Sequence, residues 1–179
     1  MGTKGTIVVG VDGSESSADA VRWALDEARK RGAEVHVVTA WHTDPPPMEG
    51  PPPMVGIPYR AKEAALAEQQ AQQDKVMDAV RDATEGVTVH RHMVGQWPPR
   101  ALVHISADAD LLVLGRHGHS WLAEKLLGSV SAYCVRHATC PVVITPAQRT
   151  EKAREHRAEE HRAEEHHMVE APATPGPLY

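Results

Sequence analysis

The stretch that decides the fold is Leu114–Ser131, LGRHGHSWLAEKLLGSVS. It carries three glycines, Gly115, Gly118 and Gly128, in the pattern G-x2-G-x9-G, and Ser129 follows the last of them. The stretch joins an apolar run to a segment with one apolar face, which is typical of a buried strand followed by a helix. Ligands bind at the carboxyl ends of parallel strands, and helix N-termini attract phosphate. The stretch therefore predicts a phosphate site, and the alternative is a loop and helix cap without a ligand.

Apolar runs of strand length alternate with segments of helical composition along most of the chain. We expect strands at residues 6–11, 34–41, 87–94, 110–115 and 141–145. We expect helices at residues 16–31, 60–84 and 129–138, and a further helix that begins at Pro98 and Pro99. Ser16 or Ser17 is the expected cap of the first helix, and Gly32 its end. Strands that alternate with helices imply an α/β fold, with a parallel sheet covered on both faces.

The composition changes twice along the chain. Residues 43–58 hold half of the 14 prolines, which predicts a loop or an extended segment. Residues 155–167, EHRAEEHRAEEHH, repeat with a period of five, which leaves no apolar stripe on a helix. We therefore expect a nucleotide-binding domain at residues 1–147, and a charged tail at 148–179 that is a solvated helix or disordered.

Charge and composition exclude several classes of protein. The net charge of −5 argues against non-specific binding of nucleic acid. No run approaches the roughly 18 apolar residues of a membrane span, and the apolar run near the N-terminus is too short for a signal peptide. Two cysteines and the absence of asparagine fit a reducing cytoplasm. We expect a cytoplasmic protein with no nucleic-acid or membrane partner.

Two better-known phosphate motifs are absent: no glycine precedes Lys-Ser or Lys-Thr, and no two glycines are spaced G-x-G. The chain instead resembles the universal stress protein family over about residues 5–146. The resemblance rests on four segments: VVGVDGS (8–14), LLVLGRHG (111–118), LLGSVS (126–131) and RHATCPVVIT (136–145). The spacing of the three glycines is that of the ATP-binding branch of the family.

The resemblance implies a flavodoxin-like sheet of order 3-2-1-4-5, with ATP and Mg²⁺ across the ends of strands 1 and 4. It implies that Asp12 contacts the adenosine part, that the backbone of Ala40 faces the adenine, and that Gly115 lies by the ribose. The residues implied at the phosphates are Gly118, Gly128, Ser129, Val130 and Ser131, while Gly10 and Val11 line the pocket. Residues 43–58 and the tail depart from the family pattern, and that loop could close over the pocket or interfere with it.

Several of these residues also have a plain structural interpretation. Asp12 precedes Gly13 and could form only an Asx-turn. Arg116, with His117 and His119, could offset phosphate charge or lie in a solvated loop.

Other candidate sites are weaker. His90 and His92 share one face of an expected edge strand, which is more often a wet surface than a metal site. In the tail only the pair His166 and His167 could bind a metal, and we expect no metal site. Cys134 is expected to be buried.

Two functions remain open. The first is a nucleotide-binding stress or regulatory protein without robust catalysis, and the second is a slow ATPase or other nucleotide-processing enzyme. An enzyme needs a residue that positions the nucleophile, and Glu124, the only acid of the glycine stretch, lies in the spacer. We therefore favour binding and name no catalytic residue. The apolar strand 141–145 and the resemblance both predict a homodimer, while the sequence identifies no downstream protein partner.

Overall fold

The computed structural model describes residues 4–42, 59–116 and 127–146. The chain divides into two units, Met1–Ala147 and Gln148–Tyr179, and every described residue belongs to the first. The expected loop 43–58 and the expected tail lie outside the described residues, as do Gly118 and Glu124.

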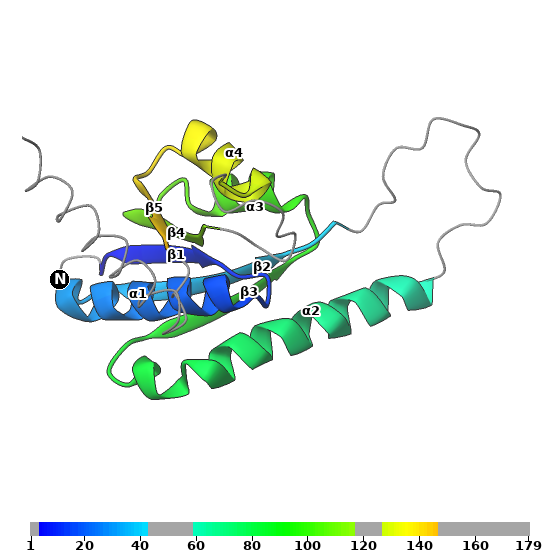
Figure 1. Ribbon diagram of the computed structural model, residues 1–179, viewed down its shortest axis with the longest axis horizontal. Helices are drawn as coiled ribbons and strands as arrows, with labels where there is room; N and C mark the ends of the chain where they lie inside the picture. The colour runs from blue at the N-terminus through cyan, green and yellow to red at the C-terminus, as the bar shows by residue number, and fades with distance from the viewer. Residues whose placement is uncertain (1–3, 43–58, 117–126, 147–179) are drawn as a thin grey trace, which may run out of the picture. The chain divides into compact units, whose positions relative to one another are not determined.

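Strands and helices alternate along the described chain, as predicted (Figure 1). The elements are β1 (Thr6–Gly10), α1 (Glu15–Arg31), β2 (Glu34–Ala40), α2 (Tyr59–Ala79), the short 3₁₀ helix η1 (Arg81–Thr84), β3 (Val89–Val94), α3 (Pro98–Ile105), β4 (Leu111–Gly115), α4 (Ser129–His137) and β5 (Val142–Thr145). All strand pairs are parallel, and their order is β3-β2-β1-β4-β5. The predicted α/β fold and its strand order are confirmed.

Two hydrophobic clusters hold the layers together, one on each face of the sheet. On the first face Ile7 and Val9 of β1 pack with Val21 and Leu25 of α1, and α2 contributes to the same cluster. On the second face Val8, Leu112, Leu102 and Cys134 join the sheet to α3 and α4. Figure 1 shows α1 and α2 on one side of the sheet and α3 and α4 on the other. The buried side chains of each strand alternate between these faces, as the pleat requires.

The ends of two helices differ from the prediction. Ser14, not Ser16 or Ser17, caps α1, because its side chain accepts a hydrogen bond from the N–H of Ser17. The expected helix 60–84 ends at Ala79, and Val80 leaves the helical conformation with a φ of −119°. Val80 is fully buried, so its packing in the core takes precedence over the helical composition that continues after it.

Two other predictions are confirmed. Gly32 ends α1 with a φ of 67°, a left-handed conformation that glycine adopts without strain. Pro98 and Pro99 occupy the first turn of α3, where a missing N–H costs nothing. None of the helices in the described ranges combines the length and the apolar character that crossing a bilayer demands.

Candidate functional site

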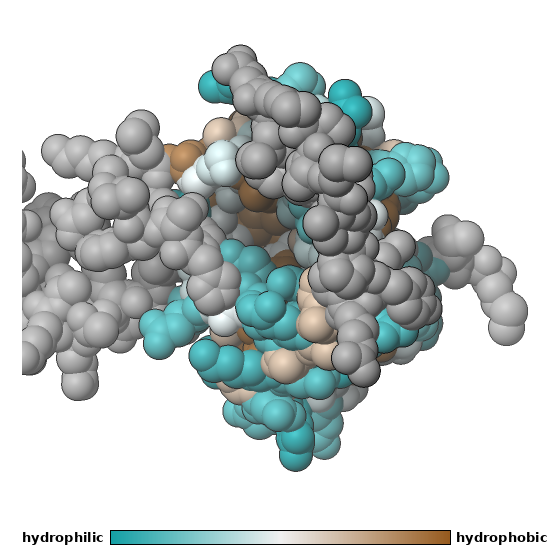
Figure 2. All heavy atoms as spheres, turned by 90° about the vertical axis from the view of Figure 1, so that its right-hand side faces the viewer, coloured by the Kyte–Doolittle hydropathy of each residue, from teal (hydrophilic) through white to brown (hydrophobic). Residues whose placement is uncertain are grey.

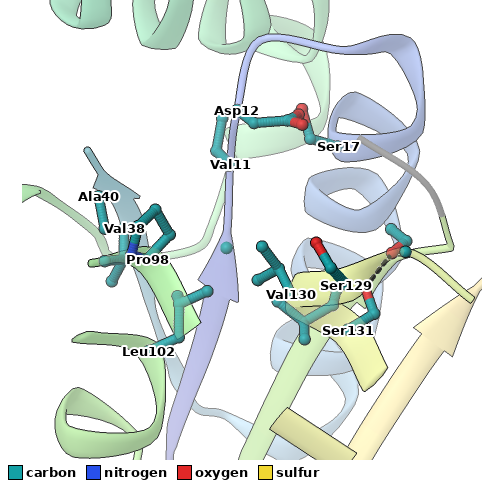
Figure 3. Close-up of a pocket in the computed structure, with 14 residues that line it drawn as sticks. Val11, Asp12, Ser17, Val38, Ala40, Pro98, Leu102, Ser129, Val130 and Ser131 are labelled. Atoms are coloured by element: carbon teal, nitrogen blue, oxygen red, sulfur yellow. Dashed lines mark hydrogen bonds between the residues drawn. The ribbon is translucent and has the colours of Figure 1, made fainter. Parts of the chain in front are cut away.

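A cavity opens at the carboxyl ends of β1, β2 and β4, where the sequence predicted a ligand site. It encloses about 280 Å³, close to the lower end of the range for small-molecule sites. The first turns of α3 and α4 close its sides. Figure 2, which faces this edge of the sheet, shows apolar surface in a hollow of the molecule. Figure 3 shows the side chains that surround it.

The cavity brings together nine of the eleven residues that the sequence singled out. These nine lining residues are Gly10, Val11, Asp12, Ala40, Gly115, Gly128, Ser129, Val130 and Ser131. Arg116 follows β4 directly but is not among the lining residues. Gly118 lies outside the described residues, together with His117 and His119.

Packing requires one of the predicted glycines, Gly115, whatever binds in the cavity. A Cβ atom on Gly115 would lie 2.5 Å from the Oγ atom of Ser16 and 2.8 Å from its backbone carbonyl oxygen. The backbone of Ser16 cannot give way easily, so glycine lets the end of β4 approach α1. At Gly10 a Cβ atom would lie 2.6 Å from the Cδ2 atom of Leu114, the end of a side chain that can shift.

The start of α4 presents backbone N–H groups to the cavity. The N–H of Gly128 donates to the carbonyl oxygen of Arg116 at 3.0 Å, and the Oγ atom of Ser131 donates to the carbonyl oxygen of Gly115 at 2.9 Å (Figure 3). These bonds fix the helix start against the end of β4. The N–H groups of Ser129, Val130 and Ser131 have no acceptor within the helix, and no side chain of the described residues caps them. They form a partial positive charge suited to an anion.

Asp12 organises the turn after β1. Its Oδ1 atom accepts the N–H of Ser14 at 3.1 Å and the hydroxyl of Ser14 at 2.6 Å. The first bond is the Asx-turn that the sequence allowed. Ser14 in turn caps α1, so Asp12 supports the start of that helix while its side chain also lines the cavity.

The opposite wall of the cavity is apolar and ends at Ala40. Val38, Pro98 and Leu102 line this side (Figure 3). The carbonyl of Val38 accepts from Val11 in β1 at 2.9 Å. Backbone groups alternate in direction along a parallel strand, so the N–H and C=O of Ala40 turn to the same side as those of Val38. β1 has already ended there, and these groups therefore point beyond its last residue.

Five lining residues were not predicted: Ser17, Val38, Pro98, Leu102 and Leu114. Val38 and Leu114 lie on predicted strands, and a strict alternation of faces would have placed them beside Gly10 on the second face of the sheet. Pro98 and Leu102 were assigned to a helix, but which end of the sheet that helix reaches depends on tertiary packing. Ser17 carries no signal of its own, since its hydroxyl donates locally to the carbonyl of Ser14.

Cys134 is buried, as predicted, and is not available as a nucleophile. Its side chain is fully buried in the cluster between the sheet and α3 and α4. Burial, followed by the nearby Cys140, raises the pKa of the Cys134 thiol to about 11. The thiol therefore stays protonated at neutral pH.

The fold agrees with comparisons to known proteins. The sequence model of the universal stress protein family matches residues 4–146, and the chain belongs to this family. It is 38% identical to a universal stress protein of Mycobacterium tuberculosis over 139 residues. This alignment covers 77% of this chain and 44% of that protein. The chain thus spans about half the length of the curated mycobacterial relatives it matches. A universal stress protein of Methanocaldococcus jannaschii is 29% identical over 150 residues, covering 81% of this chain and 84% of that one.

Solved structures of universal stress proteins share the fold. One, crystallised in complex with cAMP, superposes with a TM-score of 0.59 at 29% identity and covers 82% of this chain and all of its own. Another, from Archaeoglobus fulgidus in complex with dAMP, gives a TM-score of 0.57 at 26% identity, covering 80% of this chain and 98% of that one. Both relatives bind adenine nucleotides.

Proposed function

We propose that this chain binds ATP with Mg²⁺ in the cavity at the carboxyl ends of β1, β2 and β4. The observation that carries the proposal is the start of α4, which no side chain of the described residues caps and which the hydroxyl of Ser131 holds beside Gly115. The adenine nucleotides bound by two related structures support the same ligand class.

The apolar side of the cavity suits the base. Val38, Pro98 and Leu102 offer a surface for a flat aromatic ring, and the backbone N–H and C=O of Ala40, which point past the end of β1, can pair with its polar edge. Adenine presents one hydrogen-bond donor and one acceptor on that edge. The C=O of Ala40 can accept from the donor, and its N–H can donate to the acceptor. Asp12 lies at the end of β1 and would accept from the ribose hydroxyls.

The other side suits the phosphates. Three N–H groups at the start of α4 can donate to phosphate oxygens, and the exposed hydroxyl of Ser129 adds a fourth donor. Neither Gly115 nor Gly128 has a side chain that would keep the phosphates away. Mg²⁺ would neutralise part of the phosphate charge, and its ligands would be phosphate oxygens and water, with the hydroxyl of Ser129 within the same region.

We propose further that the bound nucleotide is held and not rapidly hydrolysed, so that the protein acts as a nucleotide-dependent regulator. Phosphoryl transfer needs a group that positions the nucleophile in line with the phosphate. The one carboxylate among the described lining residues is Asp12, and its Oδ1 atom already accepts two hydrogen bonds from Ser14. The alternative is a slow ATPase, in which a residue outside the described ranges, such as His117, His119 or Glu124, supplies that group.

Two measurements test this function. Denaturing the purified protein and identifying the released nucleotide by chromatography would show which ligand it carries. Calorimetric titration should then show ATP binding more tightly than AMP or GTP, because the α4 start selects for added phosphates and Ala40 for adenine. Equal affinity for ATP and AMP would contradict the phosphate site. ADP release at several turnovers per second, rather than far below the roughly 10 s⁻¹ typical of enzymes, would contradict the holding role.

We also propose that the protein forms a homodimer through β5. β5 is an edge strand, paired with β4 on one side only. The carbonyl of Pro141 accepts from Leu112 of β4, and that of Thr145 accepts from Arg116, the residue after β4. The N–H and C=O groups of Val142 and Ile144 therefore point to the open edge. An open edge with apolar side chains favours pairing with a second copy of the strand.

A further inference from the structure

Four polar side chains gather on the second face of the sheet, along β2 and β3. Glu34 and His36 belong to β2, and His90 and His92 belong to the edge strand β3. His36 lies beside His90 in the register of the two strands, and all four residues project from the second face of the sheet. The sequence placed His90 and His92 on one face but did not indicate that β2 would bring a third histidine and a carboxylate beside them.

The side-chain atoms of three of these residues lie close enough to share an ion. One ligand atom each from Glu34, His36 and His90 all lie within 4.8 Å of one another. The Nε2 atom of His90 is 3.0 Å from the Oε2 atom of Glu34, and the ring centres of His36 and His90 are 4.9 Å apart. Ligand atoms around a tetrahedral metal are separated by roughly 3.4 Å, given bonds of about 2.1 Å. Small side-chain rotations would therefore bring the three atoms to bonding distance.

One nitrogen of the cluster, Nε2 of His92, is buried without a hydrogen-bond partner among the described residues. Glu34 is satisfied by His90 and by Lys4, whose Nζ atom lies 3.6 Å from its Oε1 atom. The ring of His92 lies 5.0 Å from that of His36. A buried nitrogen without a partner is costly, and a bound ion with its water would provide one.

We propose that Glu34, His36 and His90 form a binding site for a divalent transition-metal ion of the zinc class. Two imidazoles and one carboxylate are a ligand set that zinc accepts, with a fourth position left for water. The ring of His92, 5.0 Å from that of His36, could accept a hydrogen bond from this water. The two imidazole nitrogens favour such an ion over Mg²⁺ and Ca²⁺, which prefer oxygen ligands.

None of the three proposed metal ligands lines the nucleotide cavity. The nearest lining residue on β2 is Val38, two residues beyond His36 on the same face, which corresponds to about 7 Å along a strand. His90 pairs with His36 on the edge strand β3, so His90→Ala can be tested with both ligands.

The direct test is a competition titration of the full-length protein with Zn²⁺ against a chromophoric chelator. The wild type should bind one Zn²⁺ at this site, and His36→Ala and His90→Ala should each weaken it at least about tenfold. The matched control is the double variant His166→Ala/His167→Ala in the tail, which should leave this affinity unchanged. His90 is exposed, so His90→Ala should fold as the wild type does, which melting in the absence of metal will verify.

The proposal requires loss of affinity in both variants of the cluster. Unchanged Zn²⁺ affinity in either of them, loss of the site in the tail variant, or no Zn²⁺ binding by the wild type would overturn it. ATP titration of His90→Ala should match the wild type, so a failed metal site leaves the proposed function untouched, and the reverse also holds.

Discussion

The hydroxyl of Ser131 donates a 2.9 Å hydrogen bond to the carbonyl oxygen of Gly115. This bond joins the first turn of α4 to the end of β4, and so connects the two glycine-bearing ends of the motif. Ser131 is buried, whereas Ser129, two residues earlier, is exposed. The two serines, which the sequence assigned to the same phosphate role, therefore differ in what their hydroxyls can do.

Ser131→Ala should lower the free energy of unfolding. The variant leaves the carbonyl of Gly115 without its hydroxyl donor, and a typical hydrogen bond of this kind contributes about 1 kcal/mol. Urea denaturation of the protein without nucleotide measures this loss. An unchanged midpoint and slope would mean that the bond does not hold the start of α4.

Ser129→Ala should lower the ATP affinity and leave the free energy of unfolding unchanged. Its hydroxyl is exposed and can reach a phosphate, so the variant should keep the stability of the wild type and lose several-fold in ATP affinity, about 1 kcal/mol. Calorimetric titration with ATP and with adenosine separates the effects, because adenosine lacks the phosphates. Equal losses for both ligands would contradict a phosphate contact.

Val142→Pro should dissociate the proposed dimer. The N–H of Val142 points to the open edge of β5, so proline removes a donor needed for pairing with a second chain but none that pairs with β4. Val142→Ala is the matched control, since it shortens the side chain and keeps the N–H. Light scattering at micromolar concentration should give a dimer for wild type and control and a monomer for the proline variant; a monomeric wild type would rule the dimer out.

The two cysteines should differ in reactivity with a thiol reagent. Cys134 is fully buried with its pKa raised to about 11, whereas Cys140 is partly exposed. The folded protein should therefore show one fast-reacting thiol near pH 8, and Cys140→Ser should remove it. The raised pKa also means that stability is lost as pH rises from the ordinary thiol value of 9.0 toward 11, since only the unfolded thiol ionises readily there. Fast labelling of Cys134 would contradict its burial.

Much of the fold could be predicted because local pattern and resemblance pointed the same way. The buried strand at Leu111–Gly115 and the helix start at Ser129 follow from apolar runs and glycines alone. The strand order came from the family resemblance, since periodicity does not say which strands are neighbours.

What could not be predicted depended on contacts between distant residues. The sequence predicted Ser16 or Ser17 as the cap of α1, and only the hydrogen bond from the N–H of Ser17 identifies Ser14. The need for glycine at Gly115 arises from the close approach of Ser16, a contact with a different element. The pairing of His36 with His90 depends on the register of β2 and β3, which the sequence does not specify.

The most direct test of the central claim is the ATP affinity of Gly128→Val. Gly128 has a φ of −57° and a ψ of 153°, an extended conformation that valine adopts without strain, so the variant should fold. Its side chain would occupy the approach to the N–H groups of α4. We predict that equilibrium titration with Mg²⁺ and ATP shows at least a tenfold loss of affinity, about 1.4 kcal/mol, with an unchanged melting temperature without nucleotide. Wild-type affinity in the folded variant would contradict the placement of the phosphates at the start of α4.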